Sequence, residues 1–371
     1  MRQGICCIFN IGPHYRTSIY KMMDQKLGCD FYFGDKVESP LKTMDYRSLN
    51  GYKHTVKNIR LFNTGFLWQS GVLRLAFGPY KHFILTGSPY ILSNHVLSLF
   101  ARVQNKRIYL WTHGVKGNSN WKKRILERFT FFMANKVLLY GDFAKNNMIQ
   151  QGYSNDKLVP VYNSLDYEEQ LIVRNQISSN LIFEEHFNNK NPVLIYIGRI
   201  QKSKKINLLI EAVAKLKSQN IFCNLVIIGK DIEGNEMPSL VDFHDLNQAV
   251  WFYGPCYDEN LIGNLIYNSD VCISPGLIGL TAIHSLTYGT PVLTSNQFNK
   301  HGPEFEAIVP GSTGDFFKDG DLEDLVRTIK KWISLNKIER EAVREKAYRI
   351  IDERYNPFNQ LKIIKRILKI A

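Results

Sequence analysis

A glycine-rich turn provides the first residues suited to chemistry in this chain. It follows the apolar run Val271–Ser274, contains Gly276 and leads into a helix expected over Leu280–Tyr288. Backbone N–H groups at such a turn, together with the helix dipole, attract phosphate. We therefore predict that the amides of Gly279, Leu280 and Thr281 hold a diphosphate. The alternative is an ordinary α/β turn, since many turns of this kind bind nothing.

A basic loop provides the second group. The sequence GRIQKSKK, residues 198–205, directly follows the apolar run Val193–Ile197. We expect Arg199 and Lys204 to point toward a ligand at the strand end. An Arg fork and a Lys point charge can together neutralise a diphosphate without a metal. The alternative is a solvated basic loop.

Histidines follow two strand-like runs in the first half of the chain. His113 ends the run LWTHG, and Gly12 and His14 follow the first run in GPHYR. We predict that His113 faces a ligand at the strand end as a polar group of the active site. Gly12 and His14 are weaker candidates for an acceptor or phosphate contact. A structural histidine at a strand end is the alternative for His113.

Strand-like and helix-like runs alternate twice along the chain, which predicts two Rossmann-like, doubly wound parallel-sheet domains. We expect an acceptor-side domain over residues 1–170, a linker over 171–191 and a second domain over 192–355. A basic helix over 356–371 would pack back toward the first domain. Two such domains would face each other across a cleft at the strand ends.

The basic charge is concentrated in the first half. The chain has 47 Lys and Arg against 34 Asp and Glu, a net charge of +13. Residues 1–186 hold 24 basic and 13 acidic residues (+11), whereas residues 187–371 hold 23 and 21 (+2). This imbalance indicates an anionic partner, namely a phosphorylated substrate, a membrane surface or nucleic acid. We see no stacking motif or basic tail that favours nucleic acid.

The cysteines and the N-terminus indicate a cytoplasmic protein. None of the six cysteines shows CxxC spacing, so we expect buried free thiols and neither zinc nor disulfides. We see no run of about 18 apolar residues and no secretory cleavage site, and hence expect no spanning helix.

These motifs resemble the nucleotide-binding domain of family 4 glycosyltransferases, which have the GT-B fold. The resemblance rests on the order GR-x4-K, LVIIG, NSDVCISP, the glycine turn and YGTPV over roughly residues 136–355. It implies that Arg199 and Lys204 bind the leaving diphosphate of a nucleotide-sugar. It also implies that His113 lies against the donor sugar, where it orients the sugar or acts on the proton of an acceptor hydroxyl. The variant GLTAIHS resembles a branch associated with bacterial surface polysaccharides.

The resemblance breaks down at two acidic positions. The family usually has a Glu before the glycine turn, contacting the donor sugar, and a Glu eight positions later, contacting the ribose. This chain has Gly276 and His284 there. We expect His284 to bind the ribose instead. Glu306 fits the family's downstream glutamate, and Glu304 is an additional acid that can supply the missing sugar contact; a solvated loop acid is the alternative.

Asp319-Gly320-Asp321 matches a D-x-D metal motif of another glycosyltransferase fold, but we predict no metal site. Asp321 precedes the amphipathic run Leu322–Leu335 and therefore is expected to cap a helix. We predict no cofactor other than the nucleotide-sugar substrate.

A basic, aromatic helix over Lys122–Ala134 can lie on an anionic membrane surface. Alternatively, Ile125, Phe129 and Phe132 face the protein core and the charges are merely solvated. Both interpretations remain open from the sequence.

The sequence thus predicts a retaining, metal-independent glycosyltransferase. It would transfer a sugar to a lipid-linked glycan on the cytoplasmic face of the membrane. This reaction would belong to capsule, O-antigen or exopolysaccharide synthesis. One alternative is a non-catalytic GT-B scaffold that binds nucleotide or a partner enzyme. Another is a different GT-B reaction such as sugar-nucleotide epimerisation.

Overall fold

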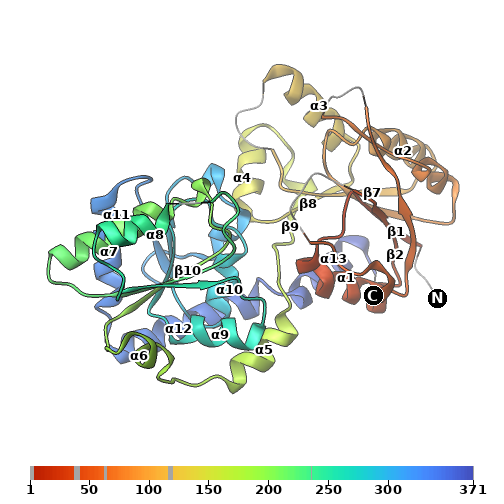
Figure 1. Ribbon diagram of the computed structural model, residues 1–371. Coiled ribbons are helices and arrows are strands. Elements are labelled where there is room, and N and C mark those ends of the chain that lie inside the picture. The colour runs from red at the N-terminus through yellow and green to blue at the C-terminus, as the bar shows by residue number, and fades with distance from the viewer. Residues whose placement is uncertain (1–3, 37–41, 62–64, 116–119, 235, 371) are drawn as a thin grey trace. The chain divides into compact units, whose positions relative to one another are not determined.

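The chain folds into two compact α/β units. The computed structural model describes residues 4–36, 42–61, 65–115, 120–234 and 236–370. Unit 1 contains the chain up to Asp166 and returns from Asn356 onward, and unit 2 is Tyr167–Tyr355 (Figure 1).

Unit 1 is built on a parallel seven-stranded sheet with the order β3-β2-β1-β6-β7-β8-β9. Its strands are β1 (Ile5–Phe9), β2 (Asp30–Gly34), β3 (Tyr52–Val56), β6 (His82–Thr86), β7 (Arg107–Thr112), β8 (Lys136–Leu139) and β9 (Leu158–Pro160). A two-stranded antiparallel ribbon joins β4 (Asn58–Arg60) to β5 (Leu67–Gln69). The central strands are apolar on both faces because helices cover both sides.

Alternate residues of β1 define the two cores of unit 1. Cys7 and Phe9 pack with α1 (Thr17–Leu27) and with α13 (Pro357–Leu368). Cys6 and Ile8 pack toward α2 (Leu92–Val103), α3 (Trp121–Phe132) and α4 (Asp142–Gln150). Figure 1 shows α13, from the end of the chain, beside α1 from its beginning. The final helix therefore completes the core of unit 1.

Unit 2 is built on a parallel six-stranded sheet with the order β12-β11-β10-β13-β14-β15. Its strands are β10 (Val193–Ile197), β11 (Asn224–Ile228), β12 (Val250–Gly254), β13 (Val271–Ser274), β14 (Val292–Ser295) and β15 (Gly314–Phe317). The chain reverses direction across the sheet between β10 and β13, which pair directly. Ligands of doubly wound sheets bind beyond the carboxyl ends of strands at such a switch point.

Helices cover both faces of the second sheet. One face carries α7 (Ile206–Ser218), α8 (Met237–Phe243) and α11 (Leu322–Ile333). The other helices of unit 2 are α5 (Tyr167–Gln176), α6 (Ile182–Phe187), α9 (Glu259–Asn268), α10 (Thr281–Thr287) and α12 (Lys337–Glu353). Figure 1 shows these five grouped on the opposite side of β10 from α7 and α8.

The fold class predicted from the sequence is confirmed, and the linker prediction is wrong. Residues 171–191 contain α6 and most of α5, and both helices pack against α9 within unit 2. The sequence of these helices is mostly polar because each helix buries only a narrow face. In α6, this face consists of Phe183 and Phe187.

Candidate functional site

The basic loop and the glycine turn of unit 2 form one structure at the carboxyl ends of β10 and β13. The amide of Gly276 donates to the carbonyl oxygen of Lys204 at 3.0 Å, and the amide of Leu277 donates to that of Ser203 at 3.1 Å. The Nζ of Lys204 also donates to the carbonyl oxygen of Leu277. Two segments 70 residues apart are thereby locked together.

Gly276 is required by this contact. A methyl group there would lie 2.1 Å from the carbonyl oxygen of Ser203 and 2.7 Å from the carbonyl carbon of Lys204. Glycine therefore stands where the related enzymes usually have a glutamate because the basic loop occupies the space of a side chain.

Arg199 and Lys204 lie close enough to repel each other. Burial lowers the pKa of the Lys204 amine, and the charge of Arg199 lowers it further. Arg199 itself is exposed and follows directly on β10. Two cations held together beside a strand end attract a multiply charged anion.

The turn after β13 directs backbone amides away from other protein groups. Within the described residues, no acceptor meets the N–H groups of Gly279, Leu280 or Thr281. The hydroxyl of Thr281 donates to the carbonyl oxygen of Ile197 at 3.2 Å, which ties the start of α10 to the end of β10. Because α10 has only seven residues, these amides rather than a helix dipole are the useful groups.

His301, which the sequence analysis missed, supports this turn. Its Nδ1 accepts from the amide of Ile278 at 3.3 Å, and its Nε2 donates to the carbonyl oxygen of Ser295 at 2.7 Å. Burial lowers the pKa of His301, so the ring is neutral and can serve as both acceptor and donor. Only the fold brings residue 301 back to the turn, so no local signal could have revealed it.

The two predicted downstream acids differ in position. Glu304 is buried, and a methyl group at Gly279 would lie 3.7 Å from its Oε2. The Glu304 carboxylate therefore borders the glycine turn, as a sugar contact requires. Glu306 lies on the same short 3-10 helix, Pro303–Ala307, and is half-buried.

His284 is held by an acid that the sequence analysis did not single out. Its Nε2 lies 2.9 Å from the Oε1 of Glu259, which also accepts from the hydroxyl of Tyr288 at 2.6 Å and from the Nε2 of Gln170 at 3.0 Å. Burial alone would raise the pKa of Glu259, but these hydrogen bonds and His284 lower it to about 2. A ribose contact by His284 would have to use its other ring nitrogen. In the sequence, Glu259 looks like an ordinary acid at a helix start.

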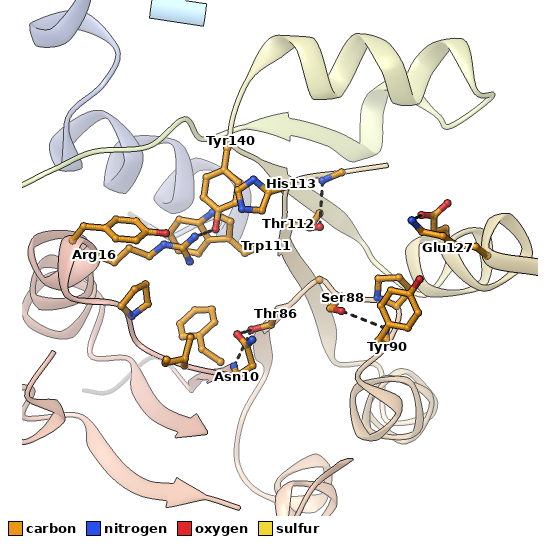
Figure 2. A pocket seen from close by; sticks show the side chains of 18 residues that line it. Asn10, Arg16, Thr86, Ser88, Tyr90, Trp111, Thr112, His113, Glu127 and Tyr140 are labelled. Atoms are coloured by element: carbon orange, nitrogen blue, oxygen red, sulfur yellow. Dashed lines mark hydrogen bonds and ion pairs between the residues drawn. The ribbon is translucent and has the colours of Figure 1, made fainter. Parts of the chain in front are cut away.

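In unit 1, a pocket of about 380 Å³ opens where β1, β6, β7 and β8 end. Figure 2 shows Arg16, Trp111, His113 and Tyr140 gathered on one side, with Tyr90 and Glu127 on the other. The His113 ring is exposed and lies against Tyr140, with 4.4 Å between ring centroids. His113 thus lies where a ligand of unit 1 can reach it.

Gly12 and His14 are not among the residues that line this pocket, although their neighbours in the sequence are. Gly12 is buried, and a methyl group there would lie 2.7 Å from the ring of Tyr46, so it is a packing glycine. His14 begins a 3-10 helix and is exposed. The residues between and after them, Pro13, Tyr15 and Arg16, line the pocket instead.

The D-x-D residues have structural partners. Both carboxylate oxygens of Asp319 accept from the Nζ of Lys205 at 2.7 Å, and the side chain of Asp321 caps α11 by accepting from the amide of Asp324. The predicted N-cap is confirmed. Within the described parts of the chain, no group of three or more His, Cys, Asp or Glu residues could hold a metal ion.

The architecture defines the class of protein. The crystal structure of Anabaena Alr3699/HepE in complex with UDP matches with a TM-score of 0.74 at 15% identity, covering 98% of this chain and 99% of that chain. Two Rossmann-like units with this arrangement make the fold GT-B-like.

The sequence comparisons point to one family. Residues 178–350, which make up most of unit 2, match the family model for glycosyl transferases group 1. The glycosyltransferase MJ1069 of Methanocaldococcus jannaschii is 24% identical over 80% of this chain and 78% of its own length. The capsular polysaccharide biosynthesis glycosyltransferase CapM of Staphylococcus aureus is 23% identical over 70% of each chain. Assignment to family 4 stays a prediction.

Replacing Gly276 with alanine tests the contact between loop and turn. Gly276→Ala should lower the free energy of unfolding by about 2 kcal/mol, because backbone atoms of residues 203 and 204 must move. Urea denaturation measures this. Gly279→Ala is the matched control, since its methyl group meets nothing closer than 3.7 Å. Equal stability of the two variants would contradict the proposed constraint.

Glu259 should make stability depend on pH. Its folded-state pKa of about 2 lies below the ordinary value of 4.5, so its ionised form stabilises the fold at neutral pH, and this contribution is lost as the pH falls from 4.5 toward 2. Glu259→Gln should therefore lower the urea midpoint at pH 7, and its difference from the wild type should shrink as the pH falls from 4.5 toward 2. Glu341→Gln, at an exposed carboxylate, is the control. A constant difference at every pH would refute this account.

Proposed function

We propose that the protein is a metal-independent, retaining glycosyltransferase that uses a nucleotide-diphosphate-sugar. The main supporting observation is the cationic site at the carboxyl ends of β10 and β13. There Lys204 lies near Arg199 and contacts the glycine turn that leads to the amides of residues 279–281. The group 1 match of unit 2 and the UDP complex of HepE support a nucleotide-sugar donor.

In the proposed reaction, the bond between the anomeric carbon and the diphosphate oxygen breaks. Its electron pair leaves with the diphosphate, whose growing charge Arg199 and Lys204 stabilise electrostatically. The oxygen of an acceptor hydroxyl bonds to the anomeric carbon, and its proton passes to the departing diphosphate. His113 orients the sugar, while Glu304 contacts its hydroxyls and His284 contacts the ribose. Retention of anomeric configuration is proposed from the family resemblance.

We further propose a lipid-linked glycan as acceptor, in surface-polysaccharide synthesis; the similarity to CapM supports this pathway class. A non-catalytic scaffold is the alternative, and Gly276 favours it because glycine cannot replace a sugar-binding carboxylate. Glu304, whose carboxylate borders Gly279, offers a compensating acid.

The α3 helix supports a membrane-bound acceptor. Four large apolar side chains form an exposed stripe along this helix. They are Trp121, Ile125, Phe129 and Phe132, whose exposed fractions are 68%, 60%, 51% and 68%. The helix instead buries Glu127, Thr130 and Phe131. The interpretation in which Ile125, Phe129 and Phe132 face the core is therefore wrong. Residues 116–119 of the basic segment lie outside the described residues.

The stripe continues onto α2 and carries positive charge. Arg102 and Lys157 each lie 5.6 Å from the centroid of the Phe132 ring, and Val103 is 77% exposed beside Arg102. Residues 99–136 contain nine Lys and Arg against Glu127 alone. Apolar side chains fringed by cations fit the surface of an anionic bilayer. No helix within the described residues is long and apolar enough to cross a membrane.

Removal of either cation should abolish transfer. We expect Arg199→Ala and Lys204→Ala each to lower kcat/KM by about 100-fold, because each removes charge stabilisation of the leaving diphosphate. Transfer and hydrolysis are measured with a panel of UDP-, GDP- and dTDP-sugars. Lys202→Ala, at an exposed lysine of the same loop, is the control. Full activity in both variants contradicts the site, and nucleotide binding without turnover of any donor favours the scaffold.

The exposed stripe should mediate vesicle binding. A Phe129→Asp, Phe132→Asp variant should bind phosphatidylglycerol-containing vesicles about tenfold more weakly than the wild type, because two apolar anchors become charged. Co-sedimentation at low salt measures this. Phe243→Asp, at a phenylalanine of unit 2 that is 81% exposed, is the control. If the double variant binds vesicles as well as the wild type does, the membrane role is refuted. If the wild type dimerises and the double variant does not, the stripe contacts a second copy of the chain instead.

A further inference from the structure

Arg16 places a cation in the wall of the unit 1 pocket without an acidic partner. Its Nη1 donates to the hydroxyl of Tyr20 at 3.3 Å, and its Nη2 donates to the hydroxyl of Tyr140. Its Nε is buried and meets no acceptor. Within the described residues, no carboxylate pairs with this guanidinium. A partly buried cation of this kind is costly unless something else compensates it.

The surrounding groups do not supply the missing charge. Burial raises the pKa of the Tyr20 hydroxyl to about 12, although Arg16 lowers it, so this phenol is neutral at physiological pH. The other charged side chains that line the pocket are Lys123 and Glu127, which lie 3.8 Å apart and compensate each other. The pocket therefore keeps one net positive charge, and it belongs to Arg16.

Aromatic rings enclose the same end of the pocket. The Arg16 guanidinium lies 4.8 Å from the ring centroid of Tyr140, 5.3 Å from that of Trp111 and 5.5 Å from that of Tyr15. The Nε1 of Trp111 is a second buried donor without an acceptor. These rings hold the guanidinium in place and leave its charge uncompensated, so an anionic ligand in the pocket would be favoured.

We propose that this end of the pocket is a subsite for an anionic group, a carboxylate or a phosphate, carried by a sugar of the acceptor. Arg16 binds the anion, and the sugar occupies the pocket beside it, where the exposed rings of His113 and Tyr90 can contact it (Figure 2). This inference rests on the proposed function, in which unit 1 takes the acceptor. Arg16 then determines specificity, because a neutral acceptor leaves its charge uncompensated.

Ligand-observed NMR on the full chain tests the subsite with three probes: methyl glucuronide, glucose 6-phosphate and methyl glucoside. At least one anionic probe should bind about tenfold more tightly than the neutral glucoside, because the hydrogen bond is charge-assisted. The stronger of the two anionic probes distinguishes a carboxylate from a phosphate. No preference in the wild type overturns the proposal.

Variants assign the preference to Arg16. Arg16→Gln should bind all three probes alike, whereas Arg47→Gln, at an exposed arginine of unit 1, should keep the wild-type preference. A preference that persists in Arg16→Gln overturns the proposal. If the Tm shows that Arg16→Gln does not fold, Arg16→Lys decides: loss of the planar fork should weaken glucuronide binding by about tenfold, and unchanged binding overturns the subsite.

Calorimetry with UDP separates this inference from the proposed function. UDP binding without an anionic preference overturns the subsite and leaves the glycosyltransferase standing. An Arg16-dependent preference without UDP binding or sugar transfer supports the subsite and removes the proposed function.

Discussion

The backbone contact between the basic loop and the glycine turn is the constraint on which unit 2 depends. Because the amides of Gly276 and Leu277 bind the carbonyls of Lys204 and Ser203, the ends of β10 and β13 share one surface. Parallel pairing of these strands at the switch point brings both segments to the same edge. A side chain at residue 276 would separate them. The departure from the family pattern is thus a consequence of how this loop is packed.

This contact also holds like charges together. The Lys204 amine loses hydration and lies near Arg199, and both effects lower its pKa. Its hydrogen bond to the carbonyl of Leu277 offsets only part of that cost. A diphosphate would restore the balance by supplying negative charge to both cations. In the proposed function, the growing negative charge of the leaving diphosphate would be stabilised by both cations.

Unit 1 also holds a cation at the ends of its strands, but different groups surround it. Its sheet also reverses direction, between β1 and β6, and its pocket lies at those strand ends. Aromatic rings rather than backbone carbonyls surround its cation, Arg16. Unit 1 holds 27 Lys and Arg against 9 Asp and Glu (+18), and unit 2 holds 20 against 25 (−5). This bias is the one expected if unit 1 binds anionic partners. The residues of the apolar stripe on α3 do not line this pocket, and we propose for them a separate role in membrane binding.

The sequence by itself determined the parallel-sheet class and the exact bounds of strands such as β10 and β13, because apolar periodicity and glycine signals are local. It also singled out Arg199 and Lys204, which follow a recognisable strand. Only the tertiary structure decided which groups surround Arg16, how His301 and Glu259 hold the turn and α10, and that Phe129 faces outward. Those outcomes depend on contacts between segments distant in sequence, which local periodicity does not encode.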